Sequence, residues 1–205
     1  MKILINFYAS VSETSVKDLI TFITQQTVAW MKNSSNPLDE IIIQISSSGW
    51  SSDHGLLAYN YLKQLNIQKT TIGMWNVDSA AVMIFASGDK RLTMPSCRFL
   101  LHEAITTVSG NFNWTKLHEI AKLNERITKD YCKVVSKVTG KSLTTVSKKV
   151  KDGQVMSSDE AKSYWLVQDV LAEPYLTDLS WLNILMINNP VQPWTIPGNQ
   201  SNIDN

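Results

Sequence analysis

The feature that most constrains this fold is the alternation of short apolar runs with segments of helical spacing. Residues 40–45, Glu-Ile-Ile-Ile-Gln-Ile, form a nearly continuous apolar run, which is typical of a strand buried on both faces. Residues 3–8 and 70–75 are also apolar and rich in β-formers, so they predict two further buried strands. Strands that alternate with helices over short links predict an α/β fold with a largely parallel sheet.

Helices are expected between these strands and in the second half of the chain. Apolar residues recur on one face over residues 15–32 and again over residues 113–138, which predicts one medium and one long helix. The small, apolar residues 79–87 predict a helix packed inside the protein. Further helices are expected at 54–65, 142–150 and 157–165, and further strands at 91–94, 98–102 and 167–171.

Composition narrows the class of protein. The 205 residues are 43% hydrophobic, which is enough for a core and too much for a disordered chain. With 19 basic and 18 acidic residues, the net charge of +1 gives no general attraction to nucleic acid or anionic lipid. No apolar run is long enough to cross a bilayer, and the first residues predict a strand rather than a signal peptide. We therefore expect a cytoplasmic protein.

The chain divides near residue 173. Residues 1–173 carry the alternating pattern and predict one domain, whereas residues 174–205 contain four of the six prolines and end in an Asn-rich stretch. We expect this tail to pack at first and then to fray. Trp181 and Trp194 belong to it. The two cysteines, Cys97 and Cys132, are too few for a disulfide framework and lack the spacing of a zinc site, so no metal or other cofactor is expected.

Two residues stand where α/β folds usually place chemistry. His102 ends a buried apolar run, and polar residues at strand ends in such sheets often form sites. A hydrogen-bonded structural histidine is the alternative. Ser79 begins a helix directly after a strand, where a hydroxyl can be a nucleophile or an ordinary helix cap. The chain lacks the Gly-x-Ser-x-Gly pattern of α/β-hydrolases.

Several segments, in the right order over about residues 3–172, make the sequence similar to the Clp protease proteolytic subunit of the ClpP/crotonase superfamily. The turn Ile-Ser-Ser-Ser-Gly-Trp-Ser at 45–51 resembles the family's Asn-Ser-Pro-Gly-Gly-Ser turn. The run Met-Pro-Ser-Cys-Arg-Phe-Leu-Leu-His at 94–102 resembles the family's run that ends in the catalytic histidine. The other matching segments are 78–81 with 86–88 around the nucleophile, Thr-Gly-Lys-Ser-Leu at 139–143, and 156–161 with 165–169.

The resemblance implies a ClpP/crotonase-like fold and a serine peptidase. Ser79 would attack the peptide carbonyl, and His102 would take the hydroxyl proton and return it to the leaving amine. The backbone amides of Trp50 and Ala80 would form the oxyanion hole. The long helix matches the one through which the family stacks its rings, so a homo-oligomer that degrades peptides or unfolded protein is expected.

Four departures from the family pattern bear on activity. The position of the third triad residue, an aspartate in the family, holds Lys149, and Asp152 lies about one helical turn further on as a displaced candidate. A surface charge is the alternative for Asp152. In the glycine turn, Trp50 replaces the second glycine and Ser48 the proline. Finally, the first strand begins at Ile3, so the family's preceding segment that engages an ATPase ring is not expected, which argues against an AAA+ ATPase partner.

Three functions follow from these residues. The first is an oligomeric serine endopeptidase. The second is a catalytically silent ClpP-like subunit that acts as a scaffold or as an inactive member of a ring. The third, a crotonase-type acyl-CoA enzyme, shares the fold but does not need a Ser/His pair at these positions, and the run that ends at His102 favours the peptidases.

Overall fold

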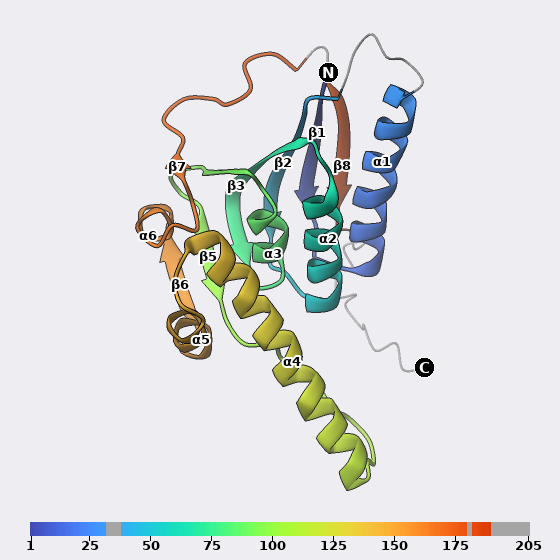
Figure 1. Cartoon of the computed structure of the whole chain (residues 1–205), viewed down its shortest axis with the longest axis vertical. Helices are drawn as coiled ribbons and strands as arrows, with labels where there is room; N and C mark the ends of the chain where they lie inside the picture. The colour runs from blue at the N-terminus through green and yellow to red at the C-terminus, as the bar shows by residue number, and fades with distance from the viewer. Residues whose placement is uncertain (32–37, 180–181, 190–205) are drawn as a thin grey trace, which may run out of the picture.

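The computed structural model describes residues 1–31, 38–179 and 182–189 (Figure 1). An eight-stranded sheet forms its centre, in the order β6-β5-β3-β2-β1-β8, with β4 pairing with β3 and β7. Every pairing is parallel except that of β5 with β6, which confirms the predicted α/β fold with a largely parallel sheet. The strands are β1 (Lys2–Tyr8), β2 (Glu40–Ser47), β3 (Gln68–Asp78), β4 (Lys90–Thr93), β5 (Arg98–Leu101), β6 (Gln154–Ser157), β7 (Asp169–Val170) and β8 (Asn183–Asn188).

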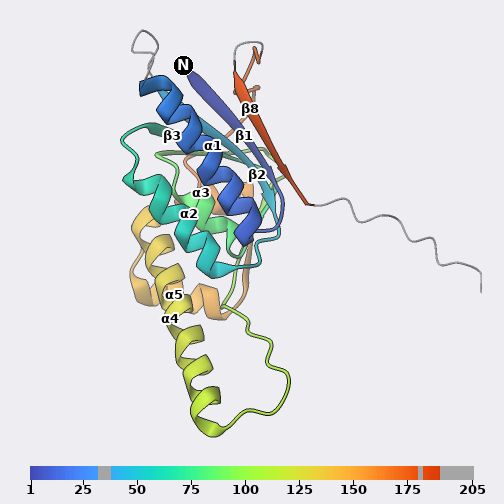
Figure 2. The same cartoon turned by 90° about the vertical axis from the view of Figure 1, so that its right-hand side faces the viewer.

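Helices cover one face of the sheet. α1, α2 and α3 pack against it, while α4 runs away from the body and projects beyond the sheet with the preceding loop beside it (Figure 2). None of the helices in the described residues is both long and apolar enough to cross a membrane. The helices are α1 (Glu13–Met31), α2 (Ser52–Gln64), α3 (Ala81–Ala86), α4 (Trp114–Thr139), α5 (Leu143–Lys151) and α6 (Ser158–Ser163).

The central strand β2 is buried on both faces, as its apolar run predicts. Ile41 and Ile43 belong to the main core between the sheet and the helices. Ile42 points the other way, into a smaller cluster with Leu4, Ile72 and Leu92. This second face is covered by apolar side chains that follow β7, namely Leu171, Tyr175, Leu176 and Leu182.

On the side away from β2, strand β3 pairs with two different neighbours along its length. Its first half lies beside β4, with Thr70 opposite Lys90, and its second half lies beside β5, with Asp78 opposite Leu100. The residues that follow β3 and β5 therefore meet at one end of the sheet. This pairing brings Ser79 and His102, which are distant in sequence, to the same region.

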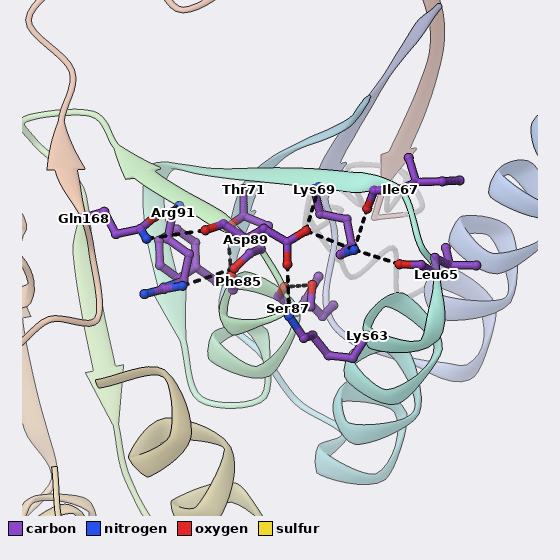
Figure 3. Close-up of polar contacts among 12 residues, drawn as sticks. Lys63, Leu65, Ile67, Lys69, Thr71, Phe85, Ser87, Asp89, Arg91 and Gln168 are labelled. Atoms are coloured by element: carbon purple, nitrogen blue, oxygen red, sulfur yellow. Dashed lines mark hydrogen bonds and ion pairs between the residues drawn. The ribbon is translucent and has the colours of Figure 1, made fainter. Parts of the chain in front are cut away.

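A buried polar cluster holds the other end of β3. Lys69 Nζ donates to the carbonyls of Leu65 at 3.0 Å and Ile67 at 2.6 Å, and it pairs with the Asp89 carboxylate at 3.0 Å (Figure 3). Arg91 Nε donates to Leu166 O at 3.0 Å and its Nη1 to Gly88 O at 3.1 Å. These charged groups satisfy carbonyls that the end of α3 and the neighbouring turns leave without partners.

Two strands lie outside the sequence prediction. β6 pairs antiparallel with β5, and β8 pairs parallel with β1 in the segment that we expected to be a tail. β6 has only four residues, too few for a periodic pattern, whereas β8 contains the apolar run Ile-Leu-Met-Ile at 184–187. Each strand pairs with a neighbour that its own residues do not identify. The expected fraying end and both tail tryptophans, Trp181 and Trp194, lie outside the described residues.

Candidate active site

Ser79 lies on a sharp turn between β3 and α3. Its backbone is left-handed, with φ of +55°, a conformation that is uncommon for a residue with a side chain. The Ser79 amide donates to Leu100 O at 2.8 Å, and its carbonyl accepts from the Val82 amide at 3.0 Å. The turn is thus held by β5 on one side and by the first turn of α3 on the other. Its partly exposed side chain lines a cavity.

The glycine turn after β2 packs directly against this serine. Gly49 has φ of +83°, and an added Cβ there would lie 2.5 Å from Asp78 O and 2.7 Å from Ser79 Cβ. Only glycine fits between these groups. The next residue, Trp50, also has a positive φ, of +117°.

The Trp50 and Ala80 amides are free to bind an oxygen atom. Val11 bridges the flanks of Trp50: its amide donates to Gly49 O at 2.6 Å, and its carbonyl accepts from the Ser51 amide at 3.0 Å. Within the described residues, neither the Trp50 nor the Ala80 amide donates to a backbone carbonyl. A Cβ added to Gly49 would lie 2.8 Å from the Ala80 nitrogen, so the two segments that carry these amides are in contact.

His102 follows β5 directly and lines the same cavity as Ser79 and Trp50. In the part of the chain that the structure describes, no hydrogen bond joins the imidazole to the Ser79 hydroxyl. Catalytic contacts of this kind are often loose without substrate. The other histidines lie elsewhere: His54 Nδ1 is 2.8 Å from Ser51 Oγ at the start of α2, and His118 is exposed on α4.

The cavity has a volume of about 560 Å³, within the range of sites that hold small organic ligands and large enough for a short peptide segment. A narrower cavity of about 230 Å³ shares Ser52, Asp53 and Ile127 with it. Sequence reasoning missed Asp53, a residue that lines both, because nothing local distinguishes it from an ordinary acidic residue in a first helical turn. The larger cavity is lined by Ser48, Trp50, Ser51, Ser52, Asp53, Ser79, His102, Ala104, Ile105, Thr106, Thr107, Asn124 and Ile127.

The loop after His102 forms one wall of this cavity and is held by α4. Asn124 Nδ2 donates to Ala104 O at 2.8 Å, and Thr106 Oγ1 donates to Asn124 Oδ1 at 2.9 Å. The Ala104 amide donates to Thr128 Oγ1 at 3.1 Å. Asn124 is a second residue that sequence reasoning missed, since its role depends on a loop about 20 positions earlier in the chain.

The candidates for the third triad position lie away from this cavity. Lys149 Nζ donates to Gln154 Oε1 at 2.9 Å and lies 5.3 Å from the centre of the Tyr164 ring. Asp152 is exposed at the end of α5 and, with Lys149, lines a separate hollow of about 390 Å³. The structure thus brings together Ser79, His102 and the amide-bearing turn but not Asp152, whose catalytic role stays a prediction.

Cys97 is no rival nucleophile. Burial raises the pKa of its thiol to about 11, so the group is protonated at neutral pH.

Arg98 stabilises the turn that carries Ser79. Its Nη2 donates to the buried Asp78 carboxylate at 2.9 Å, and Asn76 Nδ2 donates to the same oxygen at 3.2 Å. The hydrogen bond to Asp78 raises the pKa of the Arg98 guanidinium further above its usual range.

Comparison with known proteins agrees with this geometry. The Clp protease family model matches residues 5–174. The chain is 28% identical over 137 residues to the ATP-dependent Clp protease proteolytic subunit 2 of Borreliella burgdorferi, covering 66% of this chain and 68% of that protein. It is 32% identical over 136 residues to the corresponding subunit of Pleurastrum terricola, covering 65% and 68%.

Solved structures give the same fold. The chain superposes on a ClpP1 mutant from Listeria monocytogenes with a TM-score of 0.71 and 21% identity, over 84% of this chain and 91% of that one. The match confirms the ClpP-like fold that the sequence resemblance implies. β8 lies beyond the residues that the family model matches. From the family model, the relatives and the fold together, this chain belongs to the Clp protease family.

Proposed function

We propose that the protein is a serine endopeptidase that hydrolyses peptides or unfolded protein with Ser79 as nucleophile and His102 as general base. The observation that carries this proposal is that both residues line one cavity, at the adjacent ends of β3 and β5. The membership of the Clp protease family supports the serine peptidase class.

The chemistry follows from this arrangement. As Ser79 Oγ attacks the peptide carbonyl, its proton passes to the neutral His102 imidazole, and the tetrahedral oxyanion accepts hydrogen bonds from the Trp50 and Ala80 amides. The imidazolium then protonates the departing amine, which leaves an acyl-enzyme. Water, deprotonated by His102, hydrolyses that ester and restores the serine. No step uses a nucleotide, so we propose that short peptides are cleaved without an ATPase.

A fluorophosphonate probe tests the nucleophile. We expect labelling of the wild type and none of Ser79→Ala, with His102→Ala strongly reduced, while circular dichroism shows that all three fold. Cleavage of an internally quenched peptide blocked at both ends then distinguishes an endopeptidase from an exopeptidase. A folded protein that neither reacts with the probe nor cleaves the peptide contradicts the proposal.

The second candidate is a silent subunit that keeps the scaffold. Lys149 in the position of the acid favours it, because a cation cannot orient the imidazole or stabilise imidazolium. Loss of that acid alone is expected to cost up to about 10⁴ in rate rather than all activity. The turnover of Asp152→Asn and of Asp53→Asn tests whether either aspartate takes the place of the missing acid. An aspartate whose substitution leaves turnover unchanged has no part in the mechanism.

We also propose that the chain assembles with copies of itself. α4 projects from the body and carries exposed apolar side chains, including Trp114 and Leu123. Such side chains are usually covered in an assembly. Analytical ultracentrifugation of the wild type and of Trp114→Ser with Leu123→Ser tests this, and a monomeric wild type at micromolar concentration overturns it.

A further inference from the structure

We propose that Trp50 determines substrate specificity: with Ile105 it forms an apolar subsite that accepts a large apolar, preferably aromatic, side chain near the scissile bond. The inference rests on the proposed peptidase function and adds to it the class of peptide that the site selects. It assigns a role to the indole side chain, whereas the proposed mechanism uses only the Trp50 amide.

The backbone of Trp50 is strained, and burial of its side chain does not compensate for the strain. Its φ of +117° lies in a region that side-chain-bearing residues rarely adopt. The bridge of Val11 to both flanks of Trp50 holds this conformation in place. The side chain is 84% exposed, so core packing does not offset the strain. Strained residues that persist without such an offset are typical of ligand-binding positions.

The position of Trp50 makes a peptide substrate its natural contact. It lines the cavity that contains Ser79 and His102. Ser48 and Ser52, two positions before and after it in the sequence, line the same cavity. Ile105, from the loop after β5, lines the same cavity and is 80% exposed. The rest of the lining is mostly small or polar, so these two side chains are its large exposed apolar groups.

The chemistry of these groups defines the occupant. An apolar side chain that covers the indole and Ile105 removes apolar surface of both partners from water. An aromatic ring gains further from the stacked or edge-to-face contact with the indole. An acidic side chain gains nothing from the two apolar groups, and Asp53, another lining residue, carries charge of the same sign, so an acidic side chain is disfavoured.

The test uses the full-length protein and a series of blocked, internally quenched peptides that differ at one residue beside the scissile bond: Phe, Leu, Ala, Lys or Asp. Wild type is compared with Trp50→Gly, which keeps the amide and accepts the positive φ, and with Trp50→Asn, which replaces the indole with a small polar side chain. Trp165→Gly is the matched control, because Trp165 also combines a positive φ, of +69°, with 64% exposure but does not line the cavity.

We expect the wild type to prefer the Phe peptide. In Trp50→Gly and Trp50→Asn, kcat/KM for the Phe peptide falls about tenfold, mainly through KM, while the Ala peptide changes by less than about twofold. Trp165→Gly leaves both values unchanged. A wild-type preference for Lys, or unchanged or faster cleavage of the Phe peptide by the Trp50 variants, overturns the inference.

A binding measurement separates this inference from the proposed function. Fluorescence anisotropy of labelled Phe and Ala peptides is measured on Ser79→Ala, and on Ser79→Ala combined with Trp50→Gly. Tighter binding of the Phe peptide that disappears in the double variant supports the subsite even if the wild type proves to be catalytically silent. Equal affinity for the two peptides in Ser79→Ala overturns the subsite, whatever the activity of Ser79.

Discussion

Gly49 lies against Ser79 so closely that a Cβ on the glycine would come within 2.7 Å of the serine Cβ. The two residues come from turns after different strands, β2 and β3, and their contact sets the position of the amide-bearing turn relative to the nucleophile. A small displacement of either turn would separate the Trp50 and Ala80 amides, the proposed oxyanion hole, from Ser79 Oγ. The site therefore depends on this contact as much as on the identity of its reactive groups.

Gly49→Ala is expected to abolish probe labelling of Ser79 and to lower the free energy of unfolding by about 2–4 kcal/mol, since it combines positive-φ strain with a backbone clash. Gly153→Ala is the matched control: Gly153 has φ of +69°, but nothing lies within 4 Å of an added Cβ. It should show the smaller cost of the strain alone, about 1 kcal/mol, with full labelling. Denaturant unfolding and labelling check both. Equal effects of the two substitutions would show that the close contact is unimportant.

Asn124→Ala is expected to raise KM for peptide substrates about three- to tenfold, because it removes two hydrogen bonds that hold the cavity wall at Ala104 and Thr106. Labelling of Ser79 by a small probe should change little, since Ser79 is held by other contacts. Glu125→Ala, at the next, exposed position of α4, is the control. Steady-state kinetics measures the effect, and an unchanged KM would show that the loop keeps its position without Asn124.

Asp89→Ala is expected to reduce stability by about 2–3 kcal/mol, because it leaves the buried Lys69 ammonium without its carboxylate. The loss stays below that of a fully buried pair, since 44% of the Asp89 side chain is exposed. Lys63 also pairs with Asp89, at 3.1 Å, but from the surface, so Lys63→Ala should cost less than about 1 kcal/mol. Chemical denaturation compares the two. A similar cost for both would contradict the role assigned to Lys69.

Glu40 is expected to make stability sensitive to acid. Burial alone raises the pKa of its carboxyl, but hydrogen bonds from Lys2, Thr70 and Tyr175 outweigh burial and bring the pKa below the usual 4.5. Because the folded-state pKa is lowered, the carboxylate stabilises the fold above about pH 4.5, and this contribution disappears as the pH falls through the lower, folded-state value.

The measurement is the difference in unfolding free energy between wild type and Glu40→Gln. It should favour the wild type at pH 7 and shrink toward pH 3. Since Tyr175 Oη donates to Glu40 Oε1 at 2.9 Å, hydrogen exchange near Tyr175 should also accelerate in Glu40→Gln at pH 7. A difference that does not depend on pH would contradict the titration of Glu40.

Local pattern is enough to predict the main strands and helices. The apolar run of residues 40–45 predicts β2, and the recurring apolar residues of 113–138 predict α4, which the structure has at Trp114–Thr139. Ser79 and His102 can also be identified in advance, because the motifs around them resemble a known family. In contrast, β6 is too short for a clear local signal, and the apolar run of residues 184–187 in β8 lies in the segment that we expected to be a tail. Their pairing with β5 and β1 joins residues that are far apart in the sequence.

The residues of the chain by themselves therefore determine the α/β class and the parallel sheet, and they identify Ser79 and His102 as the candidate reactive side chains, since each depends on short-range spacing or on a local motif. Only the tertiary structure decides which groups share the cavity. It brings Asp53, Ile105 and Asn124 to Ser79 and leaves Asp152 at a separate hollow beside Lys149. The physical reason is that these placements depend on how β3 divides its pairing between β4 and β5, and on where α4 lies against the loop after His102. Such contacts join residues that are far apart along the chain.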